Sequence, residues 1–337
     1  MTIYDIAEKA GVSASTVSRV INDKPGVGEK TRRKIRKLLE EYHYTPDIAA
    51  RGLVMQSSRI IGILIEDIRV SHHTDAIYRI EQDMSEHGYT CITLSTGAEP
   101  EKKQAYIRIL EQRKVEGVIM IGSMFGEDSL KEEILQHLAD TPVVLVNGDM
   151  DLPNVYCVIA DEERGTEECV SYLVRKGYRQ ISYMKDAESP SNNRKLSGYR
   201  TGILKNGLKE QIFQAPGKDT NPQDSVDRGY AAAQEILNLY PGTDAILCGT
   251  DMLGVGCMHY LREAGREIPG DIAVMGVDNT IFGKIVTPTL STLDNKLEES
   301  CQNAVRILLE AIDGRSSSRK VILPTEIIGR ESTAVSS

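Results

Sequence analysis

A short N-terminal segment carries polar side chains that could read the bases of double-stranded DNA. An apolar repeat predicts a helix after Ser13, and the solvent face of this helix carries Ser15, Ser18, Arg19 and Asn22. Small hydroxyl and amide groups bind base edges, and a guanidinium can donate two parallel hydrogen bonds to one guanine. A helix that presents such groups together is typical of major-groove recognition.

A second set of polar side chains follows apolar strands in the body of the chain. Asp278 and Asn147 come directly after predicted strands, and Thr250 lies two residues beyond another. Ligands bind beyond the carboxyl ends of parallel strands, so these residues are expected to line a small-molecule site. For Asp278 the alternative is a carboxylate that caps a helix or a turn, and Asp251 is interpreted as the cap of its own helix.

The adjacent His72 and His73 raise the question of a metal site. A single metal ion rarely binds two neighbouring histidines, and the sequence offers no evident third ligand. The six cysteines are scattered without a Cys-x-x-Cys pair, so buried, reduced thiols are expected. We predict no bound metal and no cofactor, and assign the histidines to ligand contact, with a surface loop or a metal ligand as the alternatives.

Three short helices are expected to position the polar helix face of the head. Ile6 and Ala10 recur at helical spacing in a first helix that ends at Gly11, because a tight turn favours a residue tolerant of positive φ. Ser13 suits the N-cap of the second helix. A third helix, rich in lysine and arginine, is expected over 29–42. The alternative is a three-helix bundle that binds something other than DNA.

From residue 60 onward, apolar strands alternate with amphipathic helices. Strands are expected over 60–66, 89–95, 117–121, 143–146, 180–183, 245–248 and 273–277. Helices are expected over 75–87, 101–112, 162–176, 196–206, 225–239, 250–264 and 297–313. This alternation predicts parallel sheets with helices on both faces, and the segment is too long for one such sheet. We therefore predict an α/β fold: a helix-turn-helix head and a hinge, followed by a two-lobed core.

The charge distribution separates the head from the body. The first 58 residues hold 10 lysines and arginines against 7 acidic residues, and the remainder holds 30 against 42. A mildly basic head on an acidic body is expected when only one module meets phosphate groups.

No targeting or membrane segment is expected. Charged residues interrupt the first twenty positions, and the longest apolar runs, such as 60–65, are too short to span a bilayer. We therefore predict a cytoplasmic protein with no membrane partner.

Catalytic motifs are missing from the sequence. It contains no Gly-x-Ser-x-Gly elbow, no Walker loop and no Gly-x-Gly-x-x-Gly after a strand. Gly254 and Gly256 fall inside a predicted helix, which indicates packing and not phosphate binding. We predict that the chain is not an enzyme. The alternatives are a sugar-binding transport protein, which would need an export signal, and a cleft enzyme, which would need an acid or base set.

The motifs of the head resemble the lactose/galactose-repressor (LacI/GalR) family of transcriptional regulators. The resemblance rests on Asp5-Ile6-Ala7, Thr16-Val17-Ser18-Arg19-Val20-Ile21-Asn22, Thr31-Arg32 and Tyr44-Thr45-Pro46, and it extends over nearly the whole chain. It implies that bases are read by Ala14, Ser15 and Arg19. It also implies that the DNA phosphates are contacted by Tyr4, Thr16, Asn22 and Thr31.

Residues 46–58 resemble the hinge of that family. A helix of about two turns is marginal alone in water, and Gly52 lowers its stability further, so something must order it. The resemblance implies that Leu53 wedges into a minor-groove step on DNA and that Arg51 lies near the phosphates. The alternative is an ordinary interdomain linker.

The resemblance also implies the domain boundaries. The head would cover residues 1–45. The core would then contain an N-terminal lobe of residues 59–157 with 289–317, and a C-terminal lobe of residues 158–288 with 318–333. The chain would cross between the lobes three times, with an effector bound in the cleft between them.

The expected effector contacts depart from the usual family pattern. Members usually present an arginine where this chain has Lys195, with Arg194 beside it, and a lysine offers a point charge in place of a fork. Aromatic residues are common where this chain has two histidines. The full expected set is His72, His73, Asn147, Arg194, Lys195, Thr250 and Asp278.

The implied assembly is a homodimeric repressor on a near-palindromic operator. Two heads would occupy successive major grooves with the paired hinges at the centre. No leucine-heptad tail follows Arg330, so we expect a dimer. The effector is expected to be a sugar or sugar phosphate, with a nucleobase or another small metabolite as the alternatives.

Overall fold

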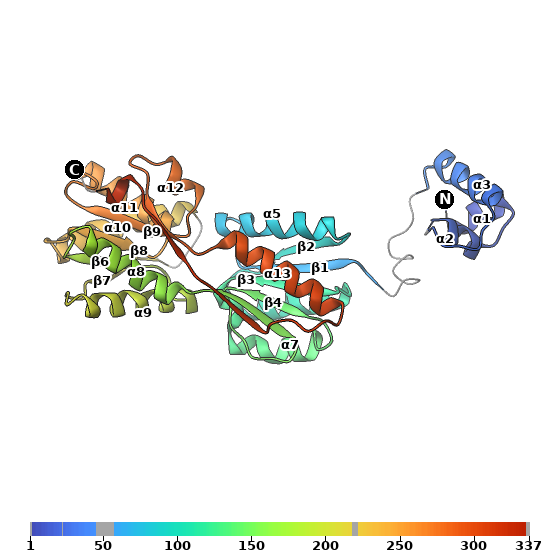
Figure 1. Ribbon diagram of the computed structural model, residues 1–337, viewed down its shortest axis with the longest axis horizontal. Coiled ribbons are helices and arrows are strands. Elements are labelled where there is room, and N and C mark those ends of the chain that lie inside the picture. Colours follow the sequence, from blue (N-terminus) through green and yellow to red (C-terminus); the bar gives the residue numbers. More distant parts are fainter. Residues whose placement is uncertain (1, 22, 45–56, 218–221, 335–337) are drawn as a thin grey trace. The chain divides into compact units, whose positions relative to one another are not determined.

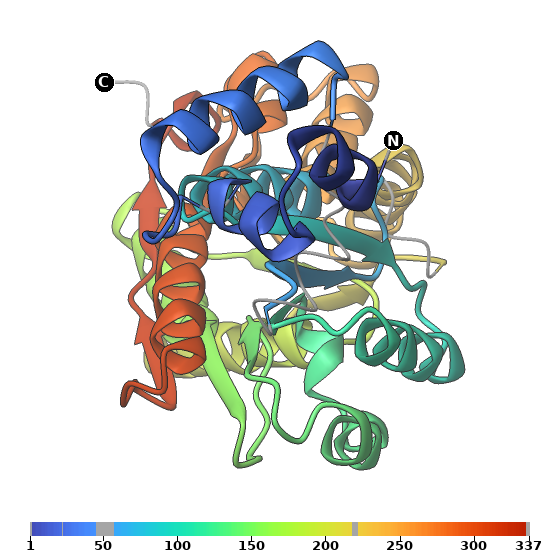
Figure 2. The same ribbon diagram turned by 90° about the vertical axis from the view of Figure 1, so that its right-hand side faces the viewer.

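The computed structural model describes residues 2–21, 23–44, 57–217 and 222–334 of the 337-residue chain. The chain divides into two compact units, Met1–Arg59 and Ile60–Ser337 (Figure 1). Figure 2 shows the helices of the first unit in blue. The two units are described separately below as the head and the core. Among the described residues, no helix is both long and apolar enough to cross a membrane.

The head contains the three predicted helices, α1 (Ile3–Ala10), α2 (Ala14–Ile21) and α3 (Glu29–Glu41). Gly11 ends α1 in the left-handed region with a φ of 69°, as the turn to α2 requires. Ser13 begins α2, because its Oγ accepts a hydrogen bond from the Thr16 backbone N–H at 3.3 Å. Apolar side chains from all three helices form the core of the head: Ile6, Ala7, Ala10, Val17, Val20 and Ile35.

Several basic side chains of α3 hold the head together. Arg32 and Arg36 both contact the Asp23 carboxylate, at 2.8 and 2.9 Å. The Lys34 ammonium donates to the backbone carbonyl of Ala10 at 2.9 Å, and a cation suits that helix terminus. About half of the basic cluster on α3 therefore has a structural role within the head.

The core contains two six-stranded sheets, each at the centre of one lobe (Figure 1). The first sheet has the strand order β11-β5-β4-β3-β1-β2, and all its neighbours are parallel. Its strands are β1 (Ile60–Ile65), β2 (Thr90–Ser95), β3 (Gly117–Ile121), β4 (Val143–Val146), β5 (Val155–Ala160) and β11 (Lys320–Leu323). Both faces are buried along the central strands β1, β3, β4 and β5, which explains their nearly continuous apolar sequences, whereas the edge strands β2 and β11 are partly exposed.

The second sheet has the order β12-β10-β9-β8-β6-β7. Only β12 runs antiparallel, beside β10. The strands are β6 (Ile181–Lys185), β7 (Ile212–Gln214), β8 (Ala245–Cys248), β9 (Ala273–Val277), β10 (Ser291–Asp294) and β12 (Glu326–Ile328). The sequence therefore predicted the two-sheet architecture correctly, but not β5 or the short strands β7, β10, β11 and β12.

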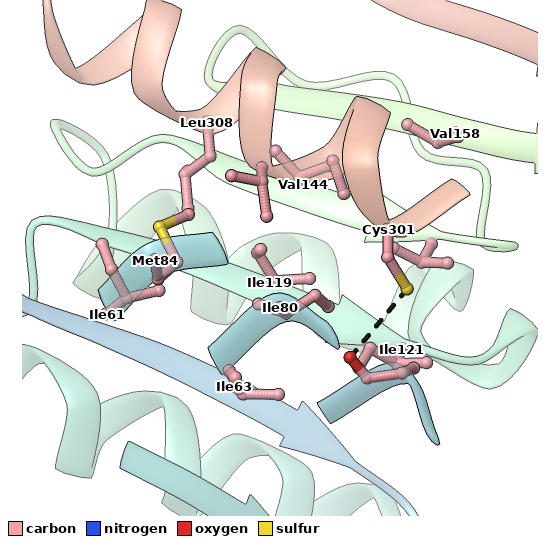
Figure 3. Packing of buried hydrophobic residues seen from close by; sticks show 14 of the residues in the cluster. Ile61, Ile63, Ile80, Met84, Ile119, Ile121, Val144, Val158, Cys301 and Leu308 are labelled. Atoms are coloured by element: carbon pink, nitrogen blue, oxygen red, sulfur yellow. Dashed lines mark hydrogen bonds between the residues drawn. The ribbon is translucent and has the colours of Figure 1, made fainter. Parts of the chain in front are cut away.

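Helices cover both faces of each sheet. The first lobe has α5 (Ser71–Glu86), α6 (Pro100–Gln112), α7 (Lys131–His137) and α13 (Leu297–Ile312). The second lobe has α8 (Glu162–Arg175), α9 (Pro190–Lys205), α10 (Pro222–Leu239), α11 (Asp251–Glu263) and α12 (Ile281–Ile285). Figure 3 shows Ile80 and Met84 of α5 and Leu308 of α13 against the strands of the first sheet, and these side chains belong to one buried apolar cluster.

The three crossings between the lobes lie later in the chain than the predicted boundaries. β5 continues to Ala160 within the first sheet, and β11 pairs with it as far as Leu323. β10 pairs with β9 of the second sheet, although the prediction assigned residues from 289 onward to the first lobe. This strand was not predicted because Ser291 and Thr292 break its apolar pattern. Their hydroxyls can be buried because side chains distant in the sequence bind them.

Two helices begin earlier than predicted. α5 begins at Ser71 and α9 at Pro190, whereas the apolar pattern predicted 75 and 196. Pro190 suits the first turn of a helix and Ser189 caps it. Two pairs of candidate effector residues, one in each helix, are therefore held on rigid elements and not on loops.

Glycines allow two pairs of helices in the second lobe to approach closely. A Cβ at Gly256 of α11 would lie 1.9 Å from the backbone oxygen of Val226 in α10, and one at Gly198 of α9 would lie 2.0 Å from the Glu163 oxygen in α8. Gly256 therefore serves packing, in agreement with its predicted role.

We expect Gly256→Ala to destabilise the core by about 2–3 kcal/mol, because the added methyl group meets backbone that cannot rotate away. Gly242→Ala is the control, since a Cβ there meets no atom within 4 Å. Chemical denaturation of both variants would measure the difference. Equal stabilities of the two variants would contradict the close packing of α10 and α11.

Candidate functional site

The exposed face of α2 carries the residues predicted to read DNA. Ser15 and Arg19 are exposed, and Ala14 and Thr16 are half-buried. The Ser13 hydroxyl lies 2.8 Å from that of Ser15 and 2.9 Å from that of Thr16. The hydroxyl groups at the start of α2 are thereby fixed in direction, while the arginine projects from its last turn.

Other predicted contacts flank this helix. Tyr4 in α1 is 72% exposed, which is unusual for so large an apolar ring. Thr31 is half-buried in the first turn of α3. The predicted contacts Asn22, Arg51 and Leu53 lie outside the described residues, as does most of the predicted hinge.

A buried glutamate, Glu162, joins the two lobes of the core. Its carboxylate lies in the first turn of α8, accepts 2.7 and 3.2 Å hydrogen bonds from Ser191 and Asn147, and receives Nη2 of Arg194 at 2.8 Å. The same Nη2 donates to Oδ1 of Asn147 at 2.8 Å. Because Asn147 follows β4 and Arg194 belongs to α9, this cluster links the first lobe to the second.

Lys195 of α9 is buried in the second lobe. It is 3% exposed, and its ammonium donates to the backbone carbonyl of Gly249 at 2.8 Å. Burial alone would raise the pKa of Glu162, but the nearby Lys195 and Arg194 outweigh it, so the pKa of Glu162 is lowered. Glu162 therefore remains an anion inside the protein.

Asp278 directly follows β9, at the carboxyl end of this strand in the second sheet. Its backbone has a φ of 107°, which is strained for any residue other than glycine. Its Oδ1 accepts a 2.9 Å hydrogen bond from Nδ2 of Asn295. Burial raises the pKa of Asp278 to about 7, although Lys195 opposes the rise. Such strain is common at ligand-binding positions.

Asp251 is not the helix cap that the sequence indicated. Thr250 occupies the N-cap of α11 and accepts from the Leu253 N–H, at 3.4 Å. The Asp251 carboxylate points into the protein and accepts from Thr280 and Thr292. Burial, followed by the charge of Asp278, raises the pKa of Asp251 to about 7.

We expect Asp278→Asn to gain stability relative to the wild type as the pH rises from about 5.5 to about 8. The pKa of Asp278 is about 7 in the fold but close to 4 in an unfolded chain, so its ionisation opposes folding in this window. The relative gain is about 2 kcal/mol. Thermal unfolding of both proteins at several pH values would measure it, and a difference independent of pH would contradict it.

His72 and His73 lie in the first turn of α5. Burial lowers the pKa of both imidazoles, although Nδ1 of His73 donates a hydrogen bond to the Asp67 carbonyl, 2.9 Å away. Both rings are therefore neutral at pH 7. Within the part of the chain that the structure describes, no three His, Cys, Asp or Glu side chains form a group that could hold a metal ion.

A cavity of about 340 Å³ lies between α5, α12 and the start of α13. Its lining brings His72 together with Asp278, which come from different lobes. The other lining residues are Asp75, Arg79, Asn279, Thr280, Ile281, Lys284, Asp294, Leu297, Glu298 and Glu299. Of the other predicted effector residues, Asn147 and Arg194 are bound to each other, Lys195 is bound to a backbone carbonyl, and Thr250 caps a helix.

Two contributors to the site escaped the sequence analysis. Glu162 and Asn295 each follow the carboxyl end of a strand, β5 and β10. The rule that identified Asp278 would have found both residues had those strands been recognised.

The chain matches two families over adjoining regions. Residues 2–47 match the family described as bacterial regulatory proteins, lacI family. Residues 58–331 match periplasmic binding proteins and sugar binding domain of LacI family. The chain belongs to the LacI family. The predicted family and fold class are thereby confirmed.

Similar proteins along the whole chain support the assignment. An HTH-type transcriptional regulator of Lachnoclostridium phytofermentans is 32% identical, covering 99% of each chain. The HTH-type transcriptional repressor PurR of Vibrio atlanticus is 30% identical, covering 98% of this chain and 97% of its own. A lac repressor dimer bound to operator and the anti-inducer ONPF has a TM-score of 0.90 at 25% identity, covering 99% of each chain.

This LacI-family protein is a DNA-binding transcriptional regulator with a ligand-binding effector domain. The similar proteins are named as regulators and repressors, in agreement with the prediction that the chain is not an enzyme. The head thus supplies the DNA-binding module and the two lobes supply the sensor.

Proposed function

We propose that this LacI-family regulator represses transcription as a homodimer on a near-palindromic operator in the cytoplasm. The observation that carries the proposal is the face of α2, where Arg19 is exposed and the hydroxyls of Ser15 and Thr16 are both held by the Ser13 hydroxyl. Such a face suits base contacts in the major groove, while Ala14 supplies apolar contact. The lac repressor similar to this chain is a dimer bound to its operator.

Phosphate contacts are assigned to residues around that face. Tyr4, Thr16, Asn22 and Thr31 would fix the position of the head, because contacts to phosphate orient a protein without reading sequence. In the segment 46–58, Arg51 would add a further phosphate contact.

Leu53 is proposed to insert into the minor groove at the centre of the operator. We expect Leu53→Ala to weaken operator binding about tenfold, because unstacking a base step is offset by contacts that only the bent DNA allows. Leu53→Met, which keeps an apolar wedge, is the matched control. Fluorescence anisotropy with labelled operator measures both, and an unchanged affinity for Leu53→Ala would refute the wedge.

Effector binding is assigned to the cleft between the lobes. Asp278 and His72, which line one cavity from opposite lobes, would contact the small molecule, with His73, Asn147, Arg194, Lys195 and Thr250 around it. A ligand that touches both lobes changes their relative positions, and such coupling is typically about 1–3 kcal/mol. A sugar or sugar derivative is the effector class that the sequence indicated.

The test is an operator titration with the full chain. A fragment of genomic DNA that the protein selects is titrated with the protein. The titration is repeated in the presence of sugars, sugar phosphates, nucleobases and amino acids. We expect one compound to change the operator affinity by about fivefold or more. Failure to bind any fragment specifically would contradict the DNA-binding role. Specific binding that no compound alters would contradict the sensor role.

A further inference from the structure

We propose that the effector is a small polyhydroxylated molecule that carries a protonated amine, and that Asp278 receives the amine. This inference rests on the proposed effector cleft and specifies the class of ligand for it. Three features support it. Among the described residues, the arginines and the lysine at the facing strand ends are bound within the protein, three carboxylates of the cavity have no ion pair, and a buried oxygen beside Asp278 has no donor.

The positive side chains at the facing ends of the strands are already bound within the protein. Arg194 is paired with Glu162 at 2.8 Å. Arg228 is paired with Asp186 at 2.7 Å, and both side chains are buried. Lys195 donates to a backbone carbonyl. A phosphate or carboxylate on the effector could bind these three cations only by displacing one of these bonds.

Three of the five carboxylates around the cavity, by contrast, have no ion pair in the described part of the chain. Among the described residues, no lysine or arginine forms an ion pair with Asp75, Asp278 or Asp294. Asp294 is held only by neutral donors, the Asn279 side chain at 3.1 Å and the Lys296 backbone N–H at 2.8 Å.

The whole lining is acidic. Of its charged groups, five are carboxylates and two are cations. Arg79 is bound to Glu298 at 2.9 Å, and Lys284 is the one cation of the lining without an ion pair among the described residues. A positive ligand would therefore be attracted to the cavity, more strongly where burial lowers the effective dielectric constant.

Asn295 adds an acceptor that lacks a donor. It is 5% exposed, its Nδ2 is bound to Asp278, and its Oδ1 has no hydrogen-bond partner among the described residues. A buried polar atom without a partner is costly. An ammonium group has three N–H donors and no acceptor, so one group could satisfy Asp278 and this neighbouring oxygen together.

Size and shape limit the rest of the ligand. About 340 Å³ is near the lower end of the range for small-molecule sites, which suits a monosaccharide. Apart from the imidazole of His72, the lining residues contribute no aromatic ring for stacking. Hydroxyl groups match such a polar lining better than a flat heterocycle does.

The experiment uses matched sets of probes with the full chain. Glucosamine, galactosamine and mannosamine are each compared with the parent hexose and its 6-phosphate, by thermal unfolding and by calorimetric titration at constant pH. We expect at least one amine to raise the melting temperature in a saturable manner and to bind at least tenfold more tightly than its parent hexose. A hexose or phosphate that binds more tightly than its amine would overturn the proposal, as would the absence of binding by all three amines.

Two variants with the same change of charge locate the effect. We expect Asp278→Asn to abolish the response to the amine, and Asp149→Asn, which removes an exposed carboxylate bound to Lys320, to retain it. Equal responses of the two variants would overturn the assignment to Asp278. Operator binding by the same preparations is measured separately, so failure of the amine leaves the DNA-binding role testable.

Discussion

Replacing Arg19 by alanine is expected to weaken operator binding by at least about thirtyfold. A guanidinium that contacts a guanine contributes about 1–3 kcal/mol of discrimination, and a symmetric dimer loses the contact twice. Arg19 is exposed, so the head should fold without it. Anisotropy titration with labelled operator measures the loss, and unchanged thermal unfolding shows that the fold is intact.

Arg33→Ala provides the comparison for this effect. Arg33 is an exposed arginine on α3 with one weak ion pair to Glu29, at 3.6 Å. If it contacts DNA at all, it contacts phosphate, so its removal should weaken specific and non-specific binding equally. The interpretation of α2 as the reading helix would be wrong if Arg19→Ala lost specific and non-specific binding to the same extent.

Glu162→Ala is expected to destabilise the core by about 3–5 kcal/mol, because it removes the anion beside the buried Lys195 and the half-buried Arg194. Arg194 loses a 2.8 Å ion pair, and the buried Lys195 loses a neighbouring negative charge. Chemical denaturation at pH 7 measures the change. Glu162→Gln should cost less, because an amide oxygen still accepts a hydrogen bond from Ser191.

Glu163→Ala is the matched control for that prediction. Glu163 is the adjacent residue on α8, but it is exposed and bound only to the Ser197 hydroxyl at 2.6 Å. Its removal should change the stability by less than about 1 kcal/mol. Similar losses for the two variants would mean that the buried cluster does not stabilise the contact between the lobes.

The architecture of the head could be predicted because its signals are local. Gly11, Ser13 and the spacing of Val17 and Val20 act within one or two helical turns. The role of Arg32 could not be predicted in this way, since its contact with Asp23 depends on how α3 packs in the head. The sequence of this basic run therefore does not reveal which of its cations have partners within the head.

The candidate cleft was predicted less completely. Asp278 was found because an apolar strand precedes it, and that strand is strongly patterned. Glu162 and Asn295 were missed because β5 and β10 were not recognised. Arg194 and Asn147 were assigned to the ligand, yet their first partners are each other and Glu162. Side-chain pairing across lobes depends on three-dimensional packing, which no local pattern encodes.

The central claim, that this chain is a dimeric regulator that reads DNA through α2, is tested most directly by selection from a random double-stranded library. The full chain and its Arg19→Ala variant are carried through the same rounds, and the enriched sequences are compared. We expect the wild type to enrich two inverted half-sites with centres about one helical turn apart, and the variant to lose that preference. No enriched motif, a single unpaired motif, or the same motif for both proteins would contradict the claim.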